Sequence, residues 1–232
     1  MVKLKICGLT QPEDARLAAD LGADFLGFIF HPGSPRCADP HRVRDMGTPG
    51  RAAPRKVGVF VDAPIAEVRR IFEASRLDVV QLHGRETPEY IRALGLPAWK
   101  ALRTRDESVL HEAARFRDTV IVLDSYVAGR AGGTGRPFDP VLVRRAIETG
   151  AKIFVAGGVS KANVAAAVSL RPFGVDINSS LEKSPGRKSR EKMQRFFEVW
   201  RSIQEENARS GGPDPKRLFG TPAFPKNEQE TG

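Results

Sequence analysis

Short apolar runs of β-type residues alternate with amphipathic segments along most of this chain. The runs expected to form strands are residues 4–6, 25–30, 56–61, 79–82, 98–102, 120–123, 152–155 and 174–177. Between them, apolar residues recur at helical spacing, as where Leu17, Ala18 and Leu21 fall on one side of segment 11–21. This alternation is typical of βαβ units and predicts a parallel sheet.

The segments between the strands predict helices, and two of them begin with a local start signal. The expected helices are residues 11–21, 42–46, 65–74, one that opens at Thr87-Pro88-Glu89, 107–116, 141–149, 162–170 and 190–205. Thr10-Gln11-Pro12-Glu13 has the pattern of a capping box with proline in the first turn. Thr87-Pro88-Glu89 indicates a threonine cap with proline at the first helical position.

Eight strand–helix units predict one compact (β/α)₈ TIM barrel over residues 1–206, since such barrels commonly span about 250 residues. The remaining segment, 207–232, is rich in glycine and proline and lacks periodicity. It predicts a flexible, disordered C-terminal tail. A doubly wound open sheet shares the alternation, but no Gly-x-Gly-x-x-Gly follows the first strand, which disfavours that fold.

Composition indicates an ordinary soluble α/β protein. Of the 232 residues, 41% are hydrophobic and 28% are charged. No apolar run approaches the roughly 20 residues of a membrane helix, so no membrane partner is expected. The first residues lack the apolar stretch of a signal peptide, and only Cys7 and Cys37 are present, which fits a reducing compartment. We therefore expect a cytoplasmic protein.

The formal charge of +9 and the pI near 9.9 allow either a nucleic acid or a small anion as partner. Basic residues are spread along the chain, and their mild clusters lack the interleaved aromatics that stack on bases. We expect no nucleic acid, and a positive field that attracts an anionic substrate. His31, His41 and His111 have no companions at metal-ligand spacing, so neither a metal nor another cofactor is expected.

Several apolar runs end at a chemically capable side chain. The run before Cys7 ends at a thiol, the run before His83 at an imidazole, and the run before Asp124 at a carboxyl group. Barrels carry their chemistry at the carboxyl ends of the strands, so the thiol and carboxyl group predict a catalytic pair. A buried, inert cysteine is the alternative for Cys7. We expect Arg36 to stabilise the thiolate and so to lower the pKa of the thiol.

Glycine clusters predict a phosphate site on the same rim. They are Gly132-Gly133-Thr134-Gly135 after the sixth strand and Gly157-Gly158 after the seventh. Glycines let backbone N–H groups approach an anion closely, and barrels often bind phosphate near the seventh and eighth strands, where Ser179 and Ser180 also fall. For a single glycine pair, a tight turn is the alternative.

These features together resemble phosphoribosylanthranilate isomerase of tryptophan biosynthesis, over residues 2 to about 200. The sequence motifs that carry the resemblance are Lys5-Ile6-Cys7-Gly8-Leu9-Thr10, Gly27-Phe28-Ile29-Phe30, Ser34-Pro35-Arg36, Val59-Phe60-Val61, Gln81-Leu82-His83-Gly84 and Gly132-Gly133-Thr134-Gly135. The resemblance implies an Amadori rearrangement of N-(5'-phosphoribosyl)anthranilate to 1-(2-carboxyphenylamino)-1-deoxyribulose 5-phosphate, without a cofactor, in a monomer or homodimer.

The resemblance also implies a role for each site residue. Asp124 would be the general acid that protonates the furanose ring oxygen, and Cys7 the general base that removes the C2' proton. Arg36 would contact the anthranilate group, and His83 would line the substrate pocket. The phosphate would be bound by Gly133, Gly135, Gly157, Gly158, Ser179 and Ser180.

The chain departs from the family pattern in three places. Asn178-Ser179-Ser180 stands where serine-serine-glycine is usual, Lys188-Ser189 where lysine-aspartate is usual, and Pro140 where tryptophan is common. We expect these changes to loosen phosphate binding without loss of the reaction. The alternative enzyme is the aminoimidazole carboxamide ribotide isomerase of histidine synthesis, which has an aspartate where Cys7 stands. The alternative without catalysis is a degenerate barrel that binds phosphosugars for regulation.

Overall fold

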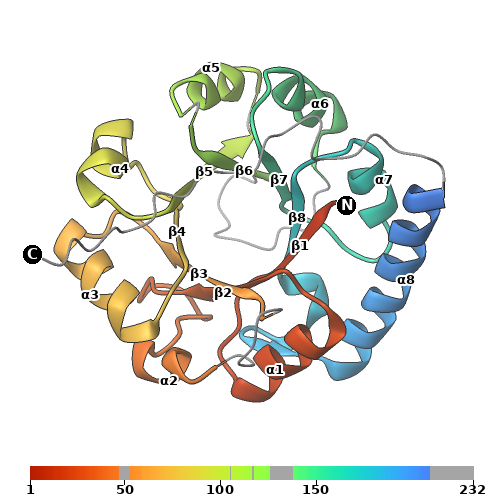
Figure 1. Cartoon of the computed structure of the whole chain (residues 1–232), viewed down its shortest axis with the longest axis horizontal. Coiled ribbons are helices and arrows are strands. Elements are labelled where there is room, and N and C mark those ends of the chain that lie inside the picture. The colour runs from red at the N-terminus through yellow and green to blue at the C-terminus, as the bar shows by residue number, and fades with distance from the viewer. Residues whose placement is uncertain (47–52, 105, 117, 126–137, 210–232) are drawn as a thin grey trace, which may run out of the picture.

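The computed structural model describes residues 1–46, 53–104, 106–116, 118–125 and 138–209. Within these residues, eight parallel strands close into a barrel in the order β1 to β8, and helices surround the ring (Figure 1). The strands are β1 Lys3–Ile6, β2 Phe25–Ile29, β3 Arg55–Phe60, β4 Val79–Leu82, β5 Ala98–Thr104, β6 Val120–Ser125, β7 Ile153–Ala156 and β8 Gly174–Ile177. Strand β8 pairs with β1, with Lys5 opposite Asp176, so the predicted TIM barrel is confirmed.

The helices lie outside the ring of strands and cover its outer face (Figure 1). They are α1 Pro12–Leu21, α2 Pro40–Arg44, α3 Ile65–Ser75, α4 Pro88–Leu94, α5 Ser108–Ala114, α6 Pro140–Glu148, α7 Val164–Ser169 and α8 Arg190–Arg209. Helix α8 lies between α7 and α1 and continues past the expected end at residue 205. Residues 210–232 lie outside the described residues, so the disordered tail stays a prediction.

Helix α8 closes the outer layer with a narrow apolar face. Met193, Phe196, Phe197 and Trp200 are buried, and their spacing places them on one side of the helix. Its opposite side carries exposed i,i+4 ion pairs such as Arg195–Glu191. Of the helices in the described ranges, none combines the length and apolar character needed to cross a bilayer.

The two predicted helix starts have different outcomes. Thr87 caps α4 by accepting a hydrogen bond from the Tyr90 N–H at 3.3 Å, with proline at the first position, as predicted. The capping box predicted at Thr10 is wrong, because the Thr10 hydroxyl instead donates to the Gly186 carbonyl. Thr10 therefore fastens a distant segment to the β1–α1 loop rather than starting the helix.

That distant segment is a feature that the sequence did not predict. A 3₁₀ turn, Ser179–Leu181, follows β8 and leads into an antiparallel pair of short strands, β9 Glu182–Ser184 and β10 Arg187–Lys188. The Lys188 N–H donates to the Asp14 carboxylate in α1 at 2.8 Å. The hairpin is thus held against the start of α1 and brings its side chains to the carboxyl end of β1.

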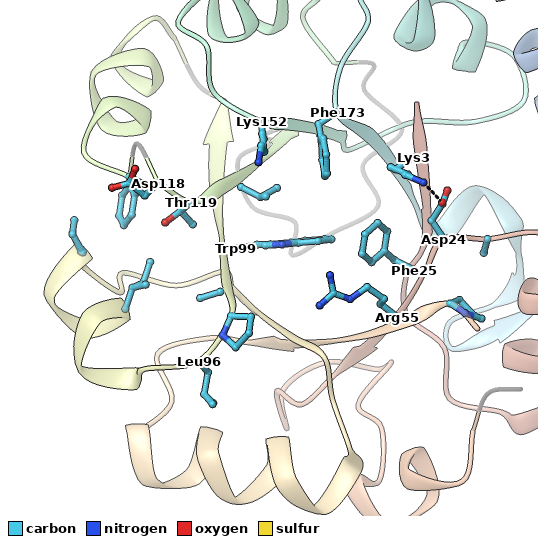
Figure 2. Close-up of a pocket in the computed structure, with 18 of the residues that line it drawn as sticks. Lys3, Asp24, Phe25, Arg55, Leu96, Trp99, Asp118, Thr119, Lys152 and Phe173 are labelled. Carbon is cyan, nitrogen blue, oxygen red and sulfur yellow. Dashed lines mark hydrogen bonds and ion pairs between the residues drawn. The ribbon is translucent and has the colours of Figure 1, made fainter. Parts of the chain in front are cut away.

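The barrel interior changes character along the barrel axis. Its apolar part is formed by Phe25, Val57, Val79, Trp99, Ala101, Val122, Phe154 and Ala156. At the amino-terminal end, Phe154 stacks on Trp99 with ring centroids 4.8 Å apart and meets Phe25 edge to face at 5.7 Å. A hollow of about 1210 Å³ opens at this end, and Figure 2 shows Phe25 and Trp99 among the residues that line it. Farther toward the other end lie the buried side chains of Gln81 and Asp176, and the ammonium of Lys5 reaches up to Asp176 from a position paired with Phe25.

Candidate active site

The described candidates from the sequence lie at the carboxyl-terminal end of the barrel. Cys7 follows β1, His83 follows β4 and Asp124 lies near the end of β6. Because all eight strands run in parallel, these ends open on one mouth. Strands β7 and β8 separate β6 from β1, so Asp124 and Cys7 face this mouth from different sides.

The Cys7 thiol is tightly enclosed. The residue is 6% exposed, and its N–H donates to the Ile177 carbonyl of β8 at 2.8 Å. A Cβ at Gly27 would lie 2.9 Å from Cys7 Sγ, so only glycine leaves room for the thiol beside β2. Gly8 adopts a φ of +70°, which turns the chain away from the barrel directly after the thiol.

Two buried charges lie below the thiol inside the barrel. Lys5 Nζ is 2.8 Å from Asp176 Oδ2, and the two side chains are 0% and 8% exposed. Burial raises the pKa of the Cys7 thiol above its ordinary value, and the Lys5 ammonium works against that rise. The lowered thiol pKa expected from the sequence is therefore wrong, because burial outweighs the nearby positive charge.

Arg36 reaches the same region but its guanidinium is paired with a carboxylate. Arg36 Nε lies 2.9 Å from Glu182 Oε1 and Nη2 lies 2.7 Å from Oε2, a two-pronged contact between the β2 loop and the hairpin. Burial works to raise the pKa of Glu182, but the hydrogen bonds from Arg36 and the charge of Lys188 hold it below its ordinary value. The stronger positive influences on Cys7 are Lys5 and Lys188, not Arg36 as expected.

Lys188 joins the end of β8 to the hairpin. Its ammonium is fully buried and donates to the Asn178 carbonyl at 3.0 Å and to Asn178 Oδ1 at 2.9 Å. It also lies 3.3 Å from Glu182 Oε1. Burial lowers the pKa of Lys188 despite this carboxylate. The Asn178 side chain, one of the departures from the family pattern, thus has a structural partner.

Asp124 lies across the mouth in a more open setting. Its Oδ2 is 3.2 Å from His83 Nε2, and the two side chains are 25% and 23% exposed. The Thr104 hydroxyl donates to the Asp124 carbonyl at 3.1 Å. A Cβ at Gly157 would lie 2.6 Å from Asp124 Oδ1, and the φ of Gly157 is +76°, so this position requires glycine. The structure thus brings together Asp124, His83 and Gly157.

The loops after β7 and β8 lie side by side at the mouth. Gly157 and Gly158 both have positive φ, and the Ser180 hydroxyl donates to the Val159 carbonyl at 2.8 Å. Ser180 therefore ties the two loops together, and Ser179 begins the turn beside it. Gly133 and Gly135 lie outside the described residues.

The structure adds charged residues that the sequence analysis did not name as site candidates, namely Lys5, Asp176, Glu182 and Lys188. Two of them carry a signal in the sequence, since Leu4-Lys5-Ile6 and Val175-Asp176-Ile177 each place a charge inside an apolar strand. Within the described ranges, no three His, Cys, Asp or Glu side chains form a group suited to a metal ion.

Comparison with known proteins decides the family. The sequence model described as N-(5'-phosphoribosyl)anthranilate (PRA) isomerase matches residues 4–199. This chain belongs to that family. The resemblance stated from the sequence is confirmed, and so is the assignment as an isomerase of tryptophan biosynthesis.

Relatives named as phosphoribosylanthranilate isomerases match almost the whole chain. The enzyme of Rubrobacter xylanophilus is 44% identical over 207 residues, which cover 87% of this chain and 100% of the relative. The crystal structure from Thermus thermophilus has a TM-score of 0.79 at 36% identity and covers 87% of this chain and 100% of its own. A third isomerase, solved with reduced 1-(o-carboxyphenylamino)-1-deoxyribulose 5-phosphate, has a TM-score of 0.77 at 30% identity with the same coverage.

Proposed function

We propose that this isomerase converts N-(5'-phosphoribosyl)anthranilate to 1-(2-carboxyphenylamino)-1-deoxyribulose 5-phosphate by acid–base catalysis, with Asp124 as the acid and Cys7 as the base. The observation that carries this proposal is the placement of a carboxyl group and a thiol on different sides of one barrel mouth. The related isomerase that was solved with reduced 1-(o-carboxyphenylamino)-1-deoxyribulose 5-phosphate supports the choice of a phosphosugar substrate.

Asp124 acts first in the proposed sequence. Its carboxyl group protonates the furanose ring oxygen, the C1'–O bond breaks, and the nitrogen lone pair forms the C1'=N bond of an open Schiff base. The side chain is 25% exposed at the mouth, so it can reach a bound substrate. A carboxylate remains after the transfer, and an N–H from His83, with its Nε2 3.2 Å away, stabilises that charge.

Cys7 acts second. Its thiolate takes the proton from C2', the C–H electrons form a C1'=C2' bond, and the C1'=N π electrons return to nitrogen. The cationic Schiff base thereby becomes a neutral enolamine, which tautomerises to the ketone. Only the thiolate can accept this proton. Because burial raises the pKa of Cys7, the reaction depends on the positive charges around the thiol.

The two ends of the substrate are assigned to different loops. Arg36, fixed by Glu182, faces the anthranilate carboxylate, and His83 lines the pocket between them. Gly157, Gly158, Ser179 and Ser180 form the described part of the phosphate site, with left-handed glycines that let the backbone approach an anion. Gly133 and Gly135 complete this site in the proposal.

The test is a fluorescence assay that follows loss of N-(5'-phosphoribosyl)anthranilate. We expect Cys7→Ala and Asp124→Asn each to lower turnover by more than about a hundredfold, the share of a positioned acid or base. Cys37→Ala is the matched control, because Cys37 is an exposed thiol on the loop after β2, and it should keep the wild-type rate. Wild-type turnover in either site variant would contradict the assignment.

Substrate choice, complementation and the Cys7→Ala variant separate the alternatives. An isomerase of the histidine branch would turn over aminoimidazole-type ribotide and fail to complement a tryptophan auxotroph that lacks this enzyme. A regulatory barrel would bind phosphosugars without turnover, and Cys7→Ala would change neither its ligand binding nor the cell phenotype.

A dimeric isomerase is known from Thermotoga maritima, at 31% identity. For this chain, a monomer or a homodimer remains the prediction.

A further inference from the structure

Lys5 and Asp176 form a buried ion pair inside the barrel. The two side chains are 0% and 8% exposed, and they face each other across the β1–β8 pairing. Within the described residues, Asp176 Oδ1 is a buried oxygen without a hydrogen-bond partner. Buried pairs often stabilise a protein no better than apolar residues of the same volume, and an unpartnered buried oxygen adds a further cost. Packing alone therefore does not account for this pair.

The pair lies directly beside the Cys7 thiol. Lys5 lies on β1 and Cys7 directly follows this strand, two residues later, so an extended backbone points both side chains to the same side of the sheet. A Cβ at Gly27 would lie 2.9 Å from Cys7 Sγ and 3.0 Å from Lys5 Cε, so the thiol and the lysine chain border the same small gap. Any larger residue at position 27 would displace the Cys7 thiol and the Lys5 side chain from this gap.

We propose that Lys5, fixed by Asp176, is the positioning residue that supplies the positive charge against which Cys7 ionises. The proposal rests on the function proposed above only where it concerns catalysis, since the ionisation of the thiol is measurable without substrate. Asp176 has two opposed effects: it keeps the lysine charged and in place, and its own negative charge disfavours the thiolate.

Lys5 keeps its charge in this setting. Burial works to lower the pKa of Lys5, but the carboxylate of Asp176 and the neighbouring thiol hold that pKa above its ordinary value. Lysine therefore remains an ammonium throughout the neutral range. A buried cation with a single carboxylate partner can stabilise one additional negative charge nearby.

The other positive charges near Cys7 belong to a separate cluster around Glu182. Lys188 on β10 and Arg36 on the β2 loop both contact Glu182. Burial also lowers the pKa of Lys188. Lys5 and Asp176 approach the thiol from the interior, on β1 and β8. Among these groups, Lys5 is the dominant stabiliser of the thiolate.

The direct test is a pH titration of the Cys7 thiolate by its ultraviolet absorbance. The protein carries Cys37→Ser, so that one thiol remains, and the spectrum of the Cys7→Ser/Cys37→Ser variant is subtracted. We expect Lys5→Met to move the titration to higher pH and Asp176→Asn to move it to lower pH. Two shifts of opposite sign distinguish an electrostatic role from a general loss of packing.

A matched control removes an equally buried lysine elsewhere. Lys100 Nζ lies 2.8 Å from Glu86 Oε2 with both side chains 2% exposed, and β5 stands opposite β1 in the ring of strands. Lys100→Met should destabilise the protein to a similar extent and leave the Cys7 titration unchanged. If Lys5→Met does not fold, Lys5→Met/Asp176→Asn removes both charges and should still move the titration above that of the protein with both residues intact.

The catalytic readout is the pH dependence of turnover. In Lys5→Met, the pH at which turnover reaches half its alkaline maximum should rise, and turnover near neutral pH should fall about tenfold, the effect of one nearby charge. An unchanged titration in folded Lys5→Met, or shifts of the same sign in both variants, would overturn the proposal. A shifted titration in a protein without isomerase activity would instead refute the proposed function and leave the electrostatic role standing.

Discussion

The interior of this barrel is filled by aromatic rings toward its amino-terminal end and by charged groups toward its carboxyl-terminal end. Toward the amino-terminal end, Phe25 meets Trp99 edge to face at 4.9 Å, and Trp99 stacks on Phe154 at 4.8 Å. Lys5 pairs with Phe25 in the β1–β2 register, but its ammonium reaches Asp176 farther toward the carboxyl-terminal end. Aromatic rings bury large apolar areas and stabilise the fold, whereas buried charges cost free energy. The comparison indicates that stability resides at one end and chemistry at the other.

Glycine serves both ends in the same way. A Cβ at Gly174 would lie 2.7 Å from Phe154 Cδ1, so the glycine on β8 admits the aromatic ring. A Cβ at Gly27 would lie 2.9 Å from Cys7 Sγ, so the glycine on β2 admits the thiol. The same local device therefore makes room for a stabilising ring at one end and for a reactive group at the other.

The largest expected effect tests the amino-terminal end. Phe154 is fully buried, so Phe154→Ala should lower the free energy of unfolding by about 3–5 kcal/mol, as lost burial and a residual cavity combine. Urea denaturation measures this loss. Phe154→Leu, which keeps most of the volume, should cost less. If turnover per folded molecule falls in either variant, the two ends are coupled and the comparison fails.

The next prediction concerns the carboxyl-terminal end. Glu182→Gln removes the carboxylate that holds Arg36 with two contacts, so the anthranilate carboxylate should bind less well. We expect KM to rise about tenfold, about 1.4 kcal/mol, with a smaller change in kcat. If Glu182 acts through Arg36, then Arg36→Gln/Glu182→Gln should lose no more than Arg36→Gln alone. Additive losses would contradict that route.

Glu182 also gives this end a pH dependence of stability. Because the pKa of Glu182 is lower in the folded protein than in the unfolded chain, its contribution is present above the unfolded value of about 4.3 and is lost as pH falls through the folded pKa. The difference in unfolding free energy between wild type and Glu182→Gln should therefore shrink on acidification. A constant difference across this range would show that the carboxylate charge plays no part.

The fold was predictable because each strand carries its own local signal. The bounds of β4 and β8 match the predicted runs, since apolar β-type residues begin and end there. Helix α2 was expected at residues 42–46 but begins at Pro40, because the Asp39 side chain accepts from the His41 N–H. The hairpin of β9 and β10 escaped prediction, because strands of three and two residues are too short to show a period.

The site was predictable only as far as strand ends reveal it. Cys7, His83 and Asp124 each follow or end an apolar run, so parallel topology alone brings them to one mouth. The Arg36–Glu182 contact joins residues 146 positions apart, and no local pattern specifies it. Lys5 was visible as a charge inside a strand, but its partner Asp176 depends on closure of the barrel between β8 and β1. The partners of Arg36 and Lys5 could therefore be identified only from the tertiary structure.

The smallest expected effect comes from a charge pair at the amino-terminal rim. Lys3 Nζ lies 2.8 Å from Asp24 Oδ1, the same distance as in the Lys5–Asp176 pair, but the side chains are 46% and 31% exposed. Water and salt screen such a pair, so Lys3→Met should cost less than about 1 kcal/mol, with turnover unchanged. Urea denaturation at low and high salt measures the cost, which should diminish as salt is added. A larger, salt-independent loss would mean that this rim also depends on buried charge, and that burial rather than position separates the two ends.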